Sequence, residues 1–267
     1  MHLKGEKETL FITLYAKAQD YRSDRPILHD HWADEMTRTV DYDFSEIARE
    51  NNTITVVRTK ELDDVVDDFI SKHHHAVVVH LGCGLDARIL RIAAPPTITW
   101  FDVDYAEVIE LRKTLFPPRN GYFMIGSSVT EPGWLKEIPV NRPALILAEG
   151  LVEYLSEEKM HRLLMQITDH FQYGHIAFDI MNSFAIKLVK DKLQTVMGVT
   201  PSWAVDDVRQ IDELNPRLKR IDSLALIRSR YIKKLPILTR LSLGICSIFP
   251  AFRNMMRIVQ YEFYQTR

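Results

Sequence analysis

The sequence predicts an α/β fold with a doubly wound, mostly parallel sheet, and three observations support that prediction. Five short apolar stretches of strand length alternate along the chain with helical patterns. These stretches are almost continuously hydrophobic, which is typical of parallel strands that helices cover on both faces. Glycines or paired prolines follow several of the elements, at points where the chain must turn.

The elements are expected in a regular order. A helix is expected at 9–18, and the polar turn "RSDRPILHDHWADEM" is expected to enter another helix. A third helix is expected at 59–75, with Thr59 as its N-cap. The five strands are expected in "AVVVHLG", "ITWFDVD", "GYFMIGSS", "ALILAEG" and "HIAFDIM". The helices that connect them are expected in "LDARILRIAA", "YAEVIELRKTLF" and "SEEKMHRLLMQITDHF".

The last third of the chain is less regular. From about Asn182 a helical lid or insertion is expected, followed by late strands in "RLKRIDSL" and the terminal "RIVQYEFYQTR". The chain therefore divides into an N-terminal helical cap that contributes to the site, a core sheet, an insertion and a return to the sheet, at 1–75, 76–181, 182–240 and 241–267. All four parts belong to one structural domain, which a chain of 267 residues can build around a substantial core.

Composition narrows the class of protein. The chain is 46% hydrophobic and 26% charged, which is ordinary for a soluble globular protein, and its formal charge of −2 gives no support for a nucleic-acid or membrane-surface partner. Its two cysteines, Cys83 and Cys246, lie far apart without metal-ligand spacing, so we expect a reduced, cytoplasmic protein. No secretion signal is expected, and the late apolar stretch around Arg240 is too short and broken to span a membrane.

The stretch "VVVHLGCGLDARIL", residues 77–90, predicts a nucleotide pocket, because it reads as a strand, a glycine turn and a helix. It matches the G-x-G-x-x-G/A fingerprint, and Asp104 follows about twenty residues later, so an NAD(P)-dependent oxidoreductase is one interpretation. Charge argues against it. Asp86 would place a carboxylate beside a bound pyrophosphate, where two anions repel unless a cation such as Arg88 intervenes.

S-adenosylmethionine removes that conflict, because it is cationic at sulfur and carries no phosphate. Gly82 and Gly84 would let the backbone approach it closely. Asp104, with Asp102 two residues earlier on the same face, would accept hydrogen bonds from the ribose hydroxyls. Glu149 at the end of the fourth strand would add negative charge beside the cationic group. The sequence therefore favours S-adenosylmethionine as the cofactor.

Three motifs in this order, "LGCGLDAR", "FDVDYAEVIELRK" and "LAEGLVEYLSEE", resemble the leucine carboxyl methyltransferase family, and most closely its branch of tetracenomycin polyketide O-methyltransferase type. The resemblance covers roughly residues 9–182. It implies a Rossmann-like, seven-stranded class I methyltransferase sheet with N-terminal helices and a helical lid insertion. It also implies an S-adenosylmethionine-dependent O-methyltransferase of secondary metabolism, with a protein C-terminal carboxylate as a less favoured acceptor.

The resemblance also implies roles for individual residues. Lys17 and Arg58 would hold the methionine carboxylate, Gly82 the methionine portion and Asp104 the ribose, while Ser128 and Val129 would contact the adenine and Glu149 would close the site. The family usually has an aspartate where Ser128 stands. A serine hydroxyl accepts a hydrogen bond more weakly, so a catalytically inactive protein that only binds the cofactor, as a scaffold, is a third interpretation.

The acceptor determines what further chemistry is needed. A carboxylate is already ionised at neutral pH, whereas a phenol with a pKa near 10 benefits from a base. The family is known for carboxyl methylation, so we expect a small polyketide-like or aromatic acid as the acceptor, methylated at its carboxylate. If a base is used, the candidates are Tyr154, His29, His31 and Asp179. No metal is expected, because the two histidines lack a third ligand.

Overall fold

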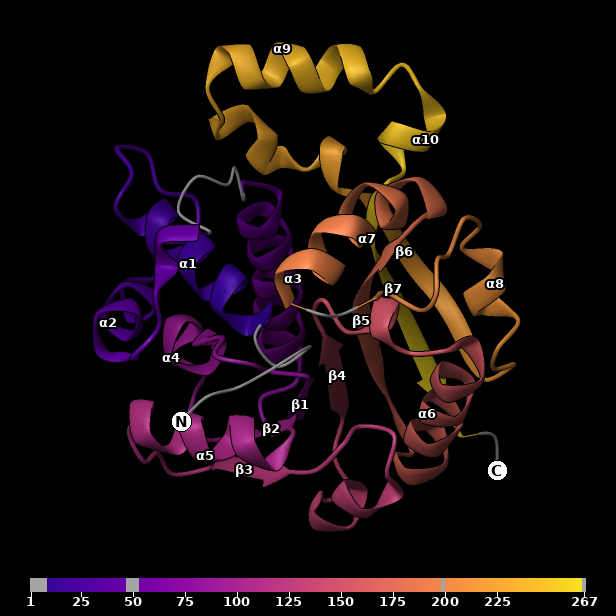
Figure 1. Ribbon diagram of the computed structural model, residues 1–267. Coiled ribbons are helices and arrows are strands. Elements are labelled where there is room, and N and C mark those ends of the chain that lie inside the picture. Colours follow the sequence, from indigo (N-terminus) through magenta and orange to yellow (C-terminus); the bar gives the residue numbers. More distant parts are fainter. Residues whose placement is uncertain (1–8, 47–52, 198–199, 266–267) are drawn as a thin grey trace.

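The computed structural model describes residues 9–46, 53–197 and 200–265, and it contains one seven-stranded sheet with helices on both faces (Figure 1). The strand order is β3-β2-β1-β4-β5-β7-β6. All strand pairs from β3 to β5 are parallel, whereas β7 runs antiparallel to both β5 and β6. The doubly wound, mostly parallel α/β fold predicted from the sequence is confirmed.

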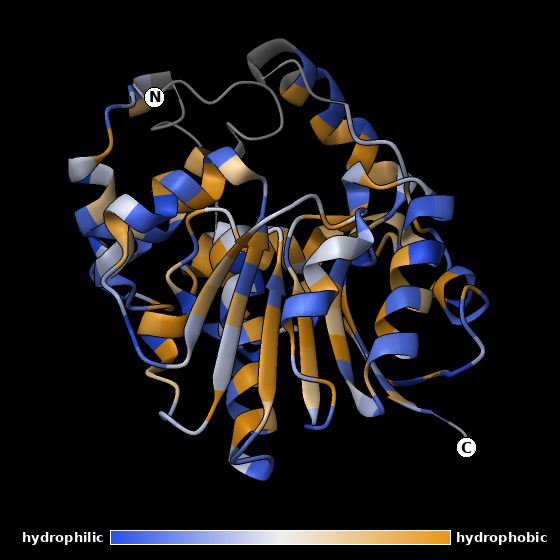
Figure 2. Cartoon of the chain, turned by 90° about the horizontal axis from the view of Figure 1, so that it is seen from below, coloured by the Kyte–Doolittle hydropathy of each residue, from blue (hydrophilic) through white to orange (hydrophobic). Residues whose placement is uncertain are grey.

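The strands lie where the apolar stretches predicted them. Their bounds are β1 Val77–Leu81, β2 Thr99–Asp104, β3 Tyr122–Gly126, β4 Ala144–Ala148, β5 Tyr173–Met181, β6 Leu218–Ala225 and β7 Met256–Tyr264. Every residue of β1 and β4 is buried, as expected for central strands covered on both faces. Figure 2 shows this arrangement, with long orange stretches on the strands and helices whose turns alternate between blue and orange.

The larger helices are α1 Thr9–Tyr21, α2 His31–Thr39, α3 Thr53–Lys72, α5 Ala106–Leu115, α6 Glu157–His170, α7 Ser183–Met197 and α9 Ile237–Cys246. The shorter ones are α4 Arg88–Ile92, α8 Arg209–Asp212 and α10 Pro250–Arg253. Side-chain caps explain two of the starts. Asp30 accepts a hydrogen bond from the backbone N–H of Ala33 in α2, and Ser156 accepts one from Lys159 in α6.

Two predictions about helix starts are wrong. α3 already includes Thr53, so Thr59 lies inside the helix, where its hydroxyl donates to Glu149 over 2.7 Å instead of capping the first turn. The helix expected over "LDARILRIAA" shrinks to the five residues of α4, because Asp86 closes a turn back to the carbonyl of Cys83 and the helix starts only at Arg88. The local sequence pattern revealed neither the hydrogen bond from Thr59 to Glu149 nor the turn from Asp86 to Cys83.

The C-terminal part is more divided than the sequence suggested. The expected lid over 182–240 contains helix α7 but also the edge strand β6. The expected return over 241–267 contains most of helix α9, which begins at Ile237, and helix α10 before β7 pairs with the sheet. Both late strands are confirmed. Figure 1 shows α9 and α10 beyond one end of the sheet, and α9 has no buried residue.

The sheet topology determines where a ligand can bind. β1 pairs with β2 on one side and with β4 on the other, so the order reverses between β1 and β4. In open α/β sheets the crevice lies beyond the carboxyl ends of the strands at such a switch point. The loops after β1, β2 and β4 therefore meet at one edge of the sheet.

Candidate functional site

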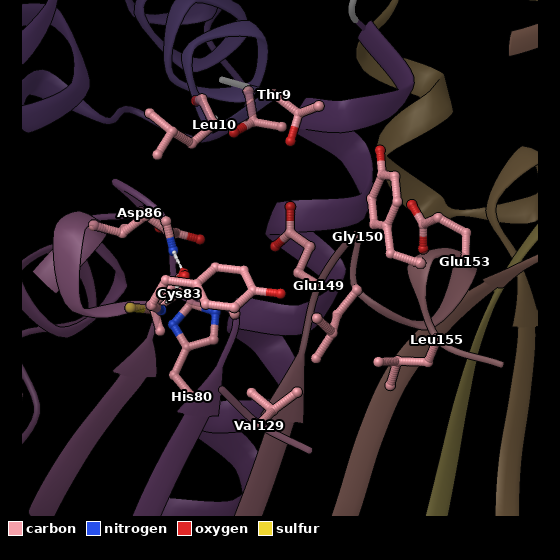
Figure 3. Close-up of a pocket in the computed structure, with 18 of the residues that line it drawn as sticks. Thr9, Leu10, His80, Cys83, Asp86, Val129, Glu149, Gly150, Glu153 and Leu155 are labelled. Carbon is pink, nitrogen blue, oxygen red and sulfur yellow. Dashed lines mark hydrogen bonds between the residues drawn. The ribbon is translucent and has the colours of Figure 1, made fainter. Parts of the chain in front are cut away.

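A cavity of about 450 Å³ lies at this edge. The loops after β1, β2, β3 and β4 form one side of it, and residues of α1 and α3 form another. Figure 3 shows Thr9 and Leu10 of α1 across the cavity from His80 and Val129. The sequence motifs that predicted a nucleotide pocket thus come together around one cavity.

The glycine turn after β1 has the backbone that its sequence requires. Gly82 and Gly84 have φ values of 61° and 49°, in the left-handed region that favours glycine. The N–H of Gly84 donates to Oδ2 of Asp104 over 2.8 Å, and the N–H of Tyr105 donates to Oδ1 over 2.7 Å. Burial raises the pKa of Asp104, and these two backbone hydrogen bonds oppose that effect. Asp104 therefore joins the loop after β1 to the end of β2.

A buried ion network lies against this turn. Within the part of the chain that the structure describes, it joins four cations, Lys17, Arg58, Arg88 and Arg91, to five carboxylates, Asp30, Asp63, Asp86, Glu149 and Asp179. Arg88 has no exposed surface and contacts three of the carboxylates, with its shortest contact of 2.5 Å to Glu149. With all groups charged, this network has one more negative charge than positive.

Glu149 is held in place by several donors. Its carboxylate accepts from Nη2 of Arg88 at 2.5 Å, from Thr59 at 2.7 Å and from Nε of Arg58 at 3.3 Å. Burial would raise the pKa of Glu149, but the positive charges of Lys17, Arg58 and Arg88 lower it to about 2. Glu149 is therefore an ionised carboxylate that lines the cavity.

Gly150 leaves room for Arg58. A side chain at Gly150 would place a Cβ atom 3.3 Å from Nη2 of Arg58, and its φ of 65° also favours glycine. The N–H of Gly150 donates to Asp179 over 2.7 Å, and Nη1 of Arg58 donates to the other oxygen of Asp179 over 2.9 Å. The glycine after Glu149 thus allows the guanidinium group to lie beside the end of β4.

The expectation that the charge of Asp86 would repel a pyrophosphate is wrong. Asp86 is compensated by three cations, since Lys17, Arg91 and Arg88 lie 3.0, 3.1 and 3.3 Å from its oxygens. Its carboxylate alone would therefore repel a phosphate only weakly. Two other features are unfavourable for a pyrophosphate: α4 has only five residues, and the amide of Gly84 already donates to Asp104.

Most residues predicted for the cofactor line the cavity: Lys17, Arg58, Gly82, Gly84, Asp104, Ser128, Val129 and Glu149. Asp102 does not. Its carboxylate accepts from Arg112, Tyr122 and the indole N–H of Trp100, and the residue is 1% exposed. Asp102 therefore orients Arg112, which in turn donates to the carbonyl of Gly84 over 2.8 Å, and it supports the glycine turn from behind.

The candidate bases are also placed differently. Tyr154 lines the cavity, whereas His29, His31 and Asp179 are not among the residues around it. Both oxygens of Asp179 are occupied by Arg58 and Gly150, so it positions Arg58. His29 has a left-handed φ of 60° in the turn before α2, and Asp30 between the histidines caps α2 and pairs with Arg91 over 2.5 Å. His29 thus lies in the turn, and His31 is the first residue of α2.

One buried acid of the cavity was missed in the sequence. Glu153 lines the cavity from the 3-10 turn Val152–Tyr154 (η4) and is 4% exposed. Its Oε2 atom has no hydrogen-bond partner among the described residues. Burial and the charge of Asp179 raise the pKa of Glu153 to about 7, against the opposing charge of Arg58. A charged residue in the otherwise apolar "GLVEYL" was the available signal.

The other end of the cavity is largely apolar. Its lining there includes Leu155 and Met181, then Val189 and Leu193 of α7, and Pro201 after it. Trp203 does not line the cavity and packs against the main hydrophobic core. The predicted insertion therefore contributes to the cavity through α7 and the segment that follows it.

Over residues 9–46, 53–197 and 200–265, no three His, Cys, Asp or Glu side chains are grouped as metal ligands would be. In the same ranges, no helix has both the length and the apolar character needed to cross a bilayer.

Known proteins are similar in sequence to most of this chain. A family model described as "Leucine carboxyl methyltransferase" matches residues 11–118. The tetracenomycin polyketide synthesis O-methyltransferase TcmP of Streptomyces glaucescens is 38% identical over 267 residues, covering 98% of each chain. The S-adenosyl-L-methionine-dependent methyltransferase dpfgK of Gibberella zeae is 32% identical over 241 residues, covering 81% of each.

Solved structures share the fold. A crystal structure of a protein from Thermobifida fusca matches with a TM-score of 0.65 and 13% identity, covering 98% of this chain and 96% of that one. The magnesium protoporphyrin IX methyltransferase of Synechocystis, solved with bound SAH, matches with a TM-score of 0.52 and 10% identity, covering 90% and 97%. At these identities the similarity shows a shared fold of the sheet and its helices.

Proposed function

Because this chain belongs to the leucine carboxyl methyltransferase family and is an S-adenosylmethionine-dependent methyltransferase, we propose that it methylates an oxygen atom of a small organic molecule. The observation that carries this proposal is the full-length similarity to TcmP, whose name describes an O-methyltransferase of polyketide synthesis. The similarity extends through α7 and the C-terminal strands, so it includes the apolar end of the cavity. The oxidoreductase interpretation is not supported.

A protein C-terminal carboxylate remains the less favoured acceptor. The leucine carboxyl methyltransferase 1 of Kluyveromyces lactis is 25% identical over 134 residues, which cover only 38% of this chain. The similarity to the polyketide enzyme is both higher and much longer. We therefore propose a small polyketide-like or aromatic acid as the acceptor.

The residues around the cavity fit S-adenosylmethionine. This cofactor carries a sulfonium, an ammonium and a carboxylate, so its net charge is positive and complements a network with an excess of carboxylates. The glycine turn is a close cradle, because a Cβ atom at Gly82 would lie 3.1 Å from Leu151 and one at Gly84 would lie 3.3 Å from Leu10. When bound, the cofactor supplies an electrophilic methyl group.

Individual residues take the following proposed roles. Asp104 accepts hydrogen bonds from the ribose hydroxyls, and Glu149 faces the positively charged methionine portion. Lys17 and Arg58 bind the methionine carboxylate with the donors that their carboxylate partners leave available. Ser128 and Val129 contact the adenine from the loop after β3.

The protein's part in the reaction is to position the acceptor and exclude water. A carboxylate acceptor is ionised and nucleophilic at neutral pH, so no base has to remove a proton from it. The apolar lining from α7 and from Leu155 suits the body of an aromatic acid and keeps the site dry. We propose methylation at the carboxylate on these grounds.

Incubation with methyl-labelled S-adenosylmethionine and a panel of aromatic acids and phenols tests the function. Mass spectrometry of the products shows which oxygen gains the methyl group. We expect a methyl ester of an aromatic acid. Cofactor binding without any methylated product across the panel would instead support a protein that only binds the cofactor.

A further inference from the structure

Glu153 is a buried acid of the cavity that has no role in the proposed function. It is 4% exposed, it lines the cavity, and its Oε2 atom has no hydrogen-bond partner among the described residues. A buried polar atom without a partner is costly, and native proteins seldom retain one. A ligand that supplied the missing partner would recover that cost on binding.

The position of Glu153 relates it to the acceptor more than to the cofactor. Figure 3 shows Glu153 and Leu155 on the opposite side of Glu149 from Cys83 and Asp86 at the glycine turn. The carbonyl of Glu153 accepts from the N–H of Ser202 over 2.7 Å, just after the Pro201 that lines the apolar end of the cavity. Glu153 is thus attached to the segment that closes the acceptor end.

The charges around Glu153 favour its neutral form. Asp179 on β5 and Glu149 after β4 are negative, and Arg58 on α3 is positive, but Arg58 is already shared between those two carboxylates. Burial and Asp179 together raise the pKa of Glu153 to about 7, while Arg58 opposes them. At and below neutral pH a large share of Glu153 therefore carries an O–H group, which is a hydrogen-bond donor.

We propose that protonated Glu153 donates a hydrogen bond to the acceptor carboxylate and positions it for methylation. This inference rests on the proposed function. One acceptor oxygen takes the hydrogen bond, and the other bonds to the methyl carbon as the carbon–sulfur bond breaks and its electron pair stays on sulfur. The proton remains on Glu153 throughout. Glu149 and Asp104 also line the cavity, and their negative charges would repel an acceptor anion. The hydrogen bond from Glu153 offsets part of that repulsion.

The role predicts an effect on binding rather than on the methyl-transfer step. The negative charge of the acceptor diminishes as its oxygen bonds to the methyl group, so the hydrogen bond weakens toward the transition state. Such an interaction lowers KM but does not raise kcat, because it is stronger with the bound acceptor than in the transition state. A base that removed a proton from a hydroxyl acceptor would show the opposite pattern, because its loss would lower kcat.

The test uses the full chain loaded with S-adenosylhomocysteine and titrated with 2-naphthoate, with neutral 2-naphthol as the matched ligand. Naphthoate binding should weaken about tenfold between pH 6 and pH 8, because a group with a pKa of about 7 loses most of its proton over that range. Glu153→Gln keeps an N–H donor at both pH values, so its affinity should stay constant. Glu153→Leu removes the donor, so the affinity of this variant for naphthoate at pH 6 should be at least about tenfold lower than that of the unaltered protein.

Three results would overturn the proposal: naphthoate that fails to bind, naphthoate affinity independent of pH in the unaltered protein, or naphthol that binds better at pH 8 than at pH 6. The last would assign Glu153 as a base for hydroxyl acceptors. S-adenosylhomocysteine affinity, measured in the same proteins, should not change with either substitution. If S-adenosylhomocysteine does not bind to the unaltered protein, that result would count against the proposed function instead.

Stability gives a readout that needs no ligand. The ordinary pKa of a glutamate is 4.5, and that of folded Glu153 is about 7, so between these values the folded protein binds more protons than the unfolded one. The contribution of Glu153 to the free energy of unfolding should therefore fall as pH rises from about 4.5 to about 7. Glu153→Gln should lack that fall, and identical pH profiles of the two proteins would contradict the neutral Glu153 on which the proposal depends.

Discussion

At the scale of the residue, the site depends on charges that are buried and shared. Arg88 illustrates this best, because its guanidinium contacts Asp63, Asp86 and Glu149 and has no exposed surface. The sequence suggested Arg88 only as a cation that could offset Asp86. Its partners lie up to 61 residues away in the chain, so no local pattern could identify them. The roles of Asp102 and Glu153 were missed for the same reason.

Removing Arg88 should therefore be strongly destabilising. In Arg88→Leu three carboxylates lose a buried partner, and the free energy of unfolding should fall by about 3–5 kcal/mol, measured by urea denaturation. Arg209→Leu is the matched control, because Arg209 also pairs with an aspartate at 2.5 Å but its side chain is 76% exposed. That control should change stability by about 1 kcal/mol or less. Equal losses in both variants would contradict a special role for the network.

At the scale of the element, helix α7 connects the fold to the apolar end of the cavity. Val189 and Leu193 line the cavity, while Leu188 on the same helix is 57% exposed. The sequence predicted a helical lid from Asn182 onward, and α7 supports the first part of that expectation. It predicted both late strands, but it assigned β6 to the span of the lid and did not indicate that β6 pairs with β7, because two antiparallel strands separated by 30 residues pair only in the folded protein.

Substitutions on two faces of α7 test this assignment. Leu193→Glu removes an apolar contact of about 1.5–3 kcal/mol and adds a negative charge at the cavity, so KM for an aromatic acid should rise about tenfold or more. Leu188→Glu places the same charge on the solvent side and should leave KM unchanged. Steady-state kinetics with the acid identified in the panel measures both. A similar KM for Leu193→Glu and the unaltered protein would remove α7 from the acceptor site.

At the scale of the whole molecule, the sequence predicted the sheet and most of the residues that line the cavity. Strand identity and order followed from apolar runs alternating with helices, because burial on both faces leaves a continuous hydrophobic pattern. Gly82, Gly84 and Asp104 were identified because their backbone and charge requirements are local. The sequence did not reveal the ion network, the role of Glu153 or the placement of α9 and α10, because these depend on contacts between distant segments. Arg58 and Asp179, 121 residues apart, are an example.

We propose that the loop after β1, joined to Asp104, holds a phosphate-free cationic cofactor. Calorimetric titration of the purified protein with S-adenosylhomocysteine and, separately, with NADH tests it most directly. We predict binding of S-adenosylhomocysteine and none of NADH, and Asp104→Ala should weaken the binding more than tenfold, since a buried diol loses a charged acceptor of about 1.5–3 kcal/mol. Binding of NADH without S-adenosylhomocysteine, or unchanged affinity in Asp104→Ala, would contradict the account.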